Sequence, residues 1–233
     1  MSTLTSLDAL GLEVLYLDRA RAFYERHLQR EARDIEDGHA VALDVGGTDL
    51  LLREPSTVPR GGLHVHYAMG APFERYDAWY DALSESFDLE EVTFGDATSL
   101  YFFDPDGHCV EIGQRDVSDE TDGLTGVFEV VLEVEDLERA EDFYRALGFE
   151  PVDRGDERPR IRLDGPMSLE LWEPHRGLAD ARGGVHADLR FSGTPLDAIE
   201  AVGERALDVE VREDSNAVRI RDPDGHYLTV ERE

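Results

Sequence analysis

The stretch Asp104-Pro105-Asp106-Gly107-His108 recurs in the second half of the chain as Asp222-Pro223-Asp224-Gly225-His226. Three further motif pairs keep the same order at nearly the same spacing: Phe23-Tyr24 with Phe143-Tyr144, Glu54-Pro55 with Glu173-Pro174, and Gly61–His64 with Gly183–His186. Matching landmarks in a constant order indicate an internal duplication. We therefore predict two homologous units, 1–115 and 125–233, joined by an acidic linker at 116–124.

The sequence pattern of each unit predicts a strand, a helix and three strands, followed by the same series again. In 128–134, apolar residues alternate with Glu129, Val131 and Glu133, as in a strand with one buried face. Proline and glycine in the Asp-Pro-Asp-Gly turn predict a hairpin between 99–103 and 109–113. We interpret His108 and His226, which follow the two turns, as residues of the hairpins. In the first unit the pattern predicts strands at 13–17, 41–45, 50–53 and 63–67. It predicts helices at 20–28 and 73–83.

The composition narrows the possible partners. The chain has 233 residues, of which 53 are acidic and 23 basic, and its formal net charge is −30. This charge repels nucleic-acid phosphates and anionic membrane surfaces, so neither is an expected partner. Every basic residue is arginine, and the acidic excess runs along the whole chain, which predicts a halophilic protein screened by high salt. The single cysteine, Cys109, and the lack of a leader-like N-terminus favour a cytoplasmic location.

The sequence resembles the vicinal oxygen chelate superfamily, which includes glyoxalase I, fosfomycin- and bleomycin-resistance proteins, and extradiol dioxygenases. The resemblance rests on Asp136–Tyr144, on the two Gly-Gly-x-His motifs, and on Asp-Pro-Asp-Gly-His followed by Glu111. It covers nearly the whole chain, and the tandem arrangement is most similar to the catechol-2,3-dioxygenase-like branch. It implies an α+β fold of four βαβββ modules forming two tandem glyoxalase/dioxygenase-like domains with cupped mixed β-sheets.

The resemblance also implies a divalent metal inside the cupped sheet, held by the first and last strands of paired modules. In the first unit the matching positions make His64, Glu111 and Glu13 the expected metal ligands, with Leu51 at the fourth position. Fe(II) or Mn(II) is favoured, and Zn(II), Ni(II) or Co(II) also suits nitrogen and carboxylate donors.

Two further residues are catalytic candidates. Strand alternation places His66 on the same face as His64, where we expect it to contact substrate. Tyr101 matches the tyrosine of the dioxygenase pattern.

The matching positions of the second unit are Glu129, Glu170, His186 and Thr229. Threonine is a poor metal ligand, so we expect a degenerate site there. Whether Glu129, Glu170 and His186 also bind a metal stays open.

These positions favour a metal-dependent enzyme acting on a small molecule chelated through vicinal oxygens. The tandem architecture and Tyr101 favour extradiol dioxygenase-like ring cleavage, whereas the carboxylate of Glu13 favours glyoxalase-type isomerisation or lyase chemistry. The alternative is a metal-free module of the bleomycin-resistance type. Its cup would be lined by Trp79, Trp172, Phe102 and Tyr227. A monomer and a homodimer are both compatible with the sequence.

Overall fold

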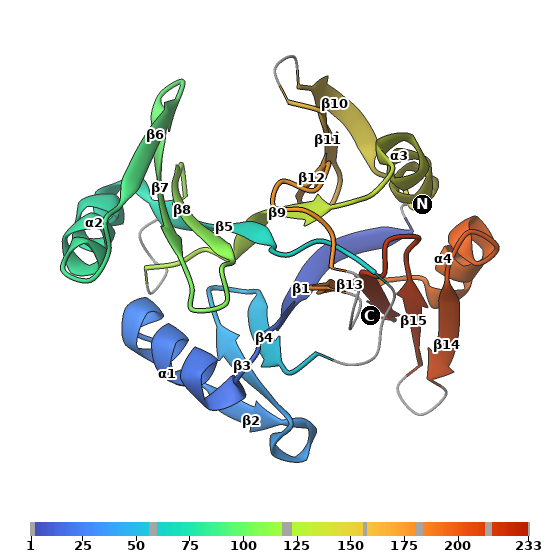
Figure 1. Cartoon of the computed structure of the whole chain (residues 1–233), viewed down its shortest axis with the longest axis horizontal. Helices are drawn as coiled ribbons and strands as arrows, with labels where there is room; N and C mark the ends of the chain where they lie inside the picture. Colours follow the sequence, from blue (N-terminus) through green and yellow to red (C-terminus); the bar gives the residue numbers. More distant parts are fainter. Residues whose placement is uncertain are drawn as a thin grey trace.

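The computed structural model describes residues 3–55, 60–117, 123–155, 158–179, 184–212 and 216–232. Within these ranges the chain forms four consecutive modules of one strand, one helix and three strands (Figure 1), which confirms the predicted α+β class. The first two modules contain β1 (Leu4–Glu13), α1 (Leu17–Leu28), β2 (Arg33–Ile35), β3 (Ala40–Asp44), β4 (Asp49–Arg53), β5 (His66–Pro72), α2 (Tyr76–Ser84), β6 (Glu90–Phe94), β7 (Ala97–Phe103) and β8 (Cys109–Arg115). The last two contain β9 (Val127–Glu133), α3 (Leu137–Ala146), β10 (Glu150–Arg154), β11 (Arg160–Asp164), β12 (Ser168–Trp172), β13 (Ala187–Gly193), α4 (Pro195–Val202), β14 (Asp208–Arg212), β15 (Ala217–Arg221) and β16 (Tyr227–Glu231).

The strands form two eight-stranded mixed sheets, neither of which closes into a barrel. The sheet that we call sheet I has the order β14-β15-β16-β13-β1-β4-β3-β2, and sheet II has the order β10-β11-β12-β9-β5-β8-β7-β6. Their central pairs, β1 with β13 and β5 with β9, are antiparallel. Sheet I therefore joins the first module to the fourth, and sheet II joins the second to the third. The boundaries 1–115 and 125–233 stay a prediction, and linker residues 118–122 lie outside the described residues.

Each sheet has one apolar face and one polar face. In sheet II, Tyr67, Val110, Val130 and Leu169 point into the buried core, which the helices cover. Residues one position away point to the opposite, concave face because side chains alternate along a strand. In Figure 1 the ends of sheet II, at β6 and β10, rise on the same side of β5 and β9. This curvature turns the polar face into a cup.

The first strand differs from its prediction. β1 spans Leu4–Glu13 rather than 13–17, and α1 begins at Leu17. Register shifts against β13 between Leu4 and Ser6 and between Leu7 and Ala9 interrupt the alternation. A bulge of this kind removes the period-two pattern from which a strand is recognised.

The predicted turn is confirmed in both copies. The N–H of Gly107 donates to the carbonyl of Asp104 at 3.1 Å, and that of Gly225 donates to Asp222 at 3.1 Å. The φ angles of these glycines are 90° and 98°, in the left-handed region that favours glycine. None of the helices in the described ranges is long and apolar enough to cross a membrane.

Candidate functional site

Four side chains with metal-binding atoms cross the concave face of sheet II in two adjacent rows. Glu170 of β12 and His66 of β5 flank one valine of β9 in the first row. Glu129 of β9 and Glu111 of β8 flank one alanine of β5 in the second. Strands two apart are separated by about 10 Å, so these side chains extend toward one another over the smaller residue between them. The two rows bring one imidazole and three carboxylates to one patch of the sheet.

A hydrogen bond and ion pairs hold this patch together. His66 Nε2 lies 3.0 Å from Glu111 Oε2. Arg162 of β11 places one nitrogen 2.6 Å from Glu129 and another 3.4 Å from Glu170. The acidic side of the patch is therefore partly neutralised by a neighbouring strand.

The electrostatics of the patch favour protonated groups. Burial raises the pKa of Glu129 to about 7; the charge of Arg162 opposes this shift, and Glu170 and Glu111 add to it. Burial also raises the pKa of Tyr101, and the negative charge and hydrogen bond of Glu111 raise it further. Tyr101 is consequently a protonated phenol at neutral pH.

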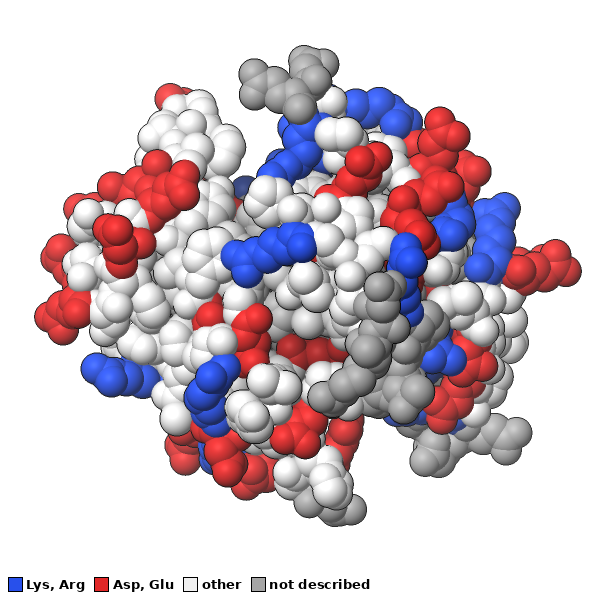
Figure 2. Space-filling model, viewed as in Figure 1, with Lys and Arg blue, Asp and Glu red and all other residues white. Residues whose placement is uncertain are grey.

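A pocket of about 650 Å³ opens on the same face. Its walls include His66, Tyr101, Cys109, Phe102, Phe103 and Trp172. Burial raises the pKa of the Cys109 thiol to about 12, so this group stays protonated. Figure 2 shows the surface hollowed between the β6 and β10 ends of sheet II. The pocket has the size and aromatic lining of a small-molecule site.

Of the three expected metal ligands, His64 lines the large pocket together with His66, and Glu13 lies on the other sheet. Glu111 lies on sheet II, whereas Glu13 ends β1 of sheet I, where its carboxylate accepts a hydrogen bond of 2.9 Å from the N–H of His186. His64 Nδ1 lies 3.1 Å from Glu133 Oε1, at the end of β9. Glu13 and Glu133 therefore occupy equivalent positions in the two sheets. Each is the last residue of its strand, and its carboxylate contacts the segment that precedes the neighbouring strand, β13 or β5.

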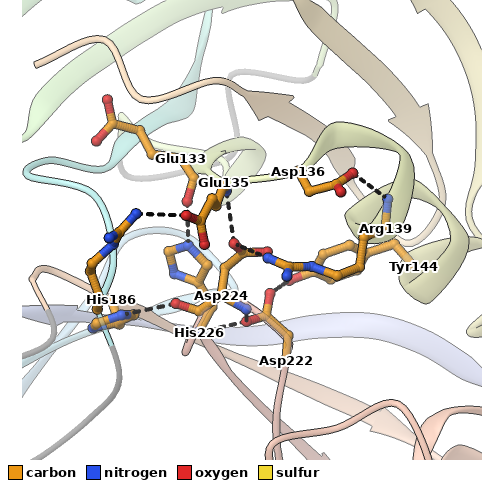
Figure 3. Close-up of polar contacts among 10 residues, drawn as sticks. Glu133, Glu135, Asp136, Arg139, Tyr144, His186, Asp222, Asp224 and His226 are labelled. Atoms are coloured by element: carbon orange, nitrogen blue, oxygen red, sulfur yellow. Dashed lines mark hydrogen bonds and ion pairs between the residues drawn. The ribbon is translucent and has the colours of Figure 1, made fainter. Parts of the chain in front are cut away.

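The Asp-Pro-Asp-Gly-His motifs join neighbouring modules. In Figure 3, Tyr144 donates to the carboxylate of Asp222 at 2.8 Å, while Arg139 contacts Asp224 at 2.8 Å. His226 Nε2 lies 3.0 Å from the backbone carbonyl of Glu133. The first copy repeats these contacts through Tyr24 with Asp104 and His108 with Glu13. The expected hairpin role of both histidines extends to this contact between modules.

The concave face of sheet I has a different set of residues at the equivalent positions. By strand register, Leu51, Asp188, Ala9 and Thr229 stand where sheet II has Glu170, His66, Glu129 and Glu111. Asp188 is fully buried, accepts a hydrogen bond of 3.1 Å from Thr229, and pairs with an arginine of β13 at 3.2 Å. This face lacks the four-donor arrangement.

The binding-module candidates are also divided between sites. Phe102 and Trp172 line the large pocket. Trp79 instead donates to the carbonyl of Gly123 at 2.9 Å, and Tyr227 lies on sheet I.

Sequence reasoning did not combine Glu129 and Glu170 with His66 and Glu111, because it paired modules within each half of the chain. At the matched positions that face the cup, the second and third modules carry these four donors, whereas the first module carries Ala9 and Leu51; strand pairing identifies these positions, and the sequence alone does not. Among the described residues, no group of three or more His, Cys, Asp or Glu side chains is already arranged to hold a metal ion.

Comparisons with known proteins agree with this architecture. Residues 6–112 match the model of the Glyoxalase/Bleomycin resistance protein/Dioxygenase superfamily. The metallothiol transferase FosB of Lysinibacillus sphaericus is 30% identical over 128 residues, which cover 52% of this chain and 89% of that protein.

Two solved structures show the same fold. Glyoxalase I from Zea mays superposes with a TM-score of 0.66 at 20% identity, covering 97% of this chain and 92% of the maize chain. A Bacillus subtilis strain 168 protein, whose assignment as a dioxygenase is provisional, has a TM-score of 0.73 at 17% identity and covers 100% of this chain and 86% of its own. From the family match and the FosB relative together, this chain belongs to the glyoxalase/bleomycin resistance protein/dioxygenase superfamily.

Proposed function

We propose that this protein is a divalent-metal-dependent enzyme acting on a small molecule, with one metal site on the concave face of sheet II. The observation that carries the proposal is the convergence of His66, Glu111, Glu129 and Glu170 beside the large pocket. The enzymes named among its relatives, a glyoxalase and a metallothiol transferase, support an enzymatic role.

The donor set fits a divalent cation by residue type. One imidazole and three carboxylates suit Fe(II) or Mn(II), and also Zn(II), Ni(II) or Co(II). The raised pKa of Glu129 reflects a buried group beside two other carboxylates, a combination that a cation stabilises. Arg160 and Arg162 lie 3.3 and 3.4 Å from Glu170, so metal binding requires these contacts to loosen.

The residues around the patch have distinct roles in this proposal. A bound metal supplies Lewis-acid polarisation of substrate oxygens. The protonated hydroxyl of Tyr101 is a hydrogen-bond donor at the pocket wall. Trp172 donates from Nε1 to Glu170 at 2.7 Å and fixes the orientation of that carboxylate. Phe103 and Trp172 supply apolar walls that exclude water from a bound substrate. Glyoxalase-type isomerisation and extradiol-type ring cleavage are the two candidate reactions at this site.

Metal analysis of matched variants tests the proposal. Wild-type protein, stripped with chelator and reloaded with Mn(II), Fe(II) or Zn(II), is expected to retain a single equivalent after desalting. His66→Gln and Glu170→Gln are expected to lose it. His64→Gln and Glu13→Gln make the same chemical changes at the positions favoured by the sequence alone, and are expected to retain it. Loss only in the second pair would return the site to those positions.

A metal-free binding module is the second candidate function. The contacts of Arg160 and Arg162 with the carboxylates favour it, because they already provide positive charge without an ion. If the wild-type protein retains no metal under any loading condition, the metalloenzyme proposal is wrong and this second function replaces it.

A further inference from the structure

The concave face of sheet I carries a concentration of positive charge. Arg53 of β4 and Arg219 and Arg221 of β15 surround the ring of Tyr227. Their guanidinium carbons lie 4.9, 3.9 and 5.9 Å from its centroid. The buried carboxylate of Asp188 lies 3.6 Å from Arg219, and the exposed carboxylate of Asp208 lies 3.5 Å from Arg221. One buried negative charge thus faces several arginines in a protein whose net charge is −30.

These arginines have buried nitrogens without acceptors. Nε and Nη2 of Arg53, Nε and Nη2 of Arg219, and Nε of Arg221 lack a hydrogen-bond partner in the described structure. Contact with a ring face contributes cation–π attraction but provides no acceptor for an N–H group in the guanidinium plane. A buried polar group without a partner is costly, and guanidinium does not lose its proton to avoid the cost. Such groups in native proteins indicate an ordered water or ion.

We propose that this face of sheet I binds a tetrahedral oxyanion, a phosphate or sulfate group, between Arg53 and Arg219. The two arginines come from strands on opposite sides of β1 and β13 and both reach the ring of Tyr227, so a ligand that contacts both needs acceptors that point in more than one direction. A tetrahedral oxyanion has such acceptors, whereas a planar carboxylate directs its two oxygens to one side. Guanidinium groups bind phosphate through paired N–H donors.

The neighbouring surface gives solvent access to this face. A pocket of about 340 Å³ opens on the same sheet, lined in part by Leu51 and Arg190, although the arginines around Tyr227 do not line it. Four acidic residues also line the pocket, Asp8, Glu36, Asp49 and Glu231; of these, Asp49 is paired with Arg33, and Glu36 lies 3.5 Å from Arg190. These pairs reduce the repulsion that an entering anion meets. The site is separate from the proposed metal patch, because it lies on the other sheet.

Calorimetric titration with inorganic phosphate tests the site, with sodium acetate as the planar comparison. Wild-type protein is expected to bind one phosphate and to bind acetate at least about tenfold more weakly. Arg53→Gln and Arg219→Gln are expected to weaken phosphate binding by at least about tenfold. Arg145→Gln removes the same charge from an exposed position on α3 and is expected to leave binding unchanged.

The conservative variant Arg219→Lys keeps the charge but loses the paired donors, and it covers the case in which Arg219→Gln fails to fold. It is expected to weaken phosphate binding while leaving the circular dichroism spectrum unchanged. Absence of phosphate binding to wild type, binding that Arg145→Gln weakens equally, or acetate binding as tight as phosphate binding would each overturn the proposal.

Discussion

Replacing Glu129 by glutamine in metal-free protein is expected to stabilise the fold at high pH. Glu129 is 7% exposed, and its pKa is about 7 rather than the ordinary 4.5. Between these two values the folded protein holds a proton that the unfolded chain has released, so stability falls as pH rises through this range. The full effect is about 3 kcal/mol above pH 8.

Glutamine cannot ionise, so it does not incur this loss. Glu129→Gln is therefore expected to exceed wild type in free energy of unfolding by up to about 3 kcal/mol at pH 8. The difference is expected to be close to zero near pH 4.5. Glutamine also keeps a carbonyl oxygen for the N–H groups of Arg162, which lies 2.6 Å from the carboxylate.

Guanidinium unfolding in the presence of chelator, at pH 5 and pH 8, measures the effect. Glu150→Gln removes the same charge from the exposed edge strand β10 and serves as the control. A stability gain of Glu129→Gln that is equal at both pH values would show that ionisation of this carboxyl is not its cause. The same pH-dependent gain in the control would assign the effect to net charge.

Four further perturbations test the contacts and charges that stabilise the fold. Tyr144→Phe is expected to cost about 2 kcal/mol in urea unfolding, because the buried aspartate of its turn loses a charged hydrogen bond. Tyr24→Phe is expected to cost more, since Tyr67 also donates to that hydroxyl at 3.1 Å, and equal costs would contradict this account. Asp188→Asn is expected to lower the free energy of unfolding by about 3 kcal/mol or more, since Arg219 and its neighbours lose their buried counter-charge. An unchanged free energy of unfolding in this variant would refute that role of Asp188. Raising KCl from about 0.1 to 2 M is expected to increase the melting temperature by screening the net charge of −30, and a decrease would contradict the halophilic interpretation.

Local signals explain the parts of the fold that were predicted correctly. The helix of the third module, α3, begins directly after Asp136, whose side chain accepts from the N–H of Arg139 at 3.0 Å. The turn at Asp104–His108 follows from proline and glycine at fixed positions. The alternation of 128–134 correctly places Glu129 on the face opposite the core. Each of these features depends on residues close together in the sequence.

Pairing between modules depends on contacts that are distant in sequence. Glu13 resembles Glu129 when the two halves are compared as strings, but by strand register it corresponds to Glu133. The bulges in β1 displace its strand positions and hide this correspondence. His66 and Glu111 alone do not reveal that Glu129 and Glu170 complete their patch. The same motifs are compatible with pairing of modules within each half of the chain and with pairing of the second module with the third.

The crossed pairing of β1 with β13 and β5 with β9 has an evolutionary consequence. Two identical half-length chains paired in this way would form a twofold-symmetric dimer, in which any mutation appears in both cups at once. Covalent fusion of the halves removes that constraint, because each cup then mutates independently. One cup can keep its imidazole and carboxylates while the other accumulates arginines, and a single ancestral pocket can thereby diverge into two of opposite charge preference.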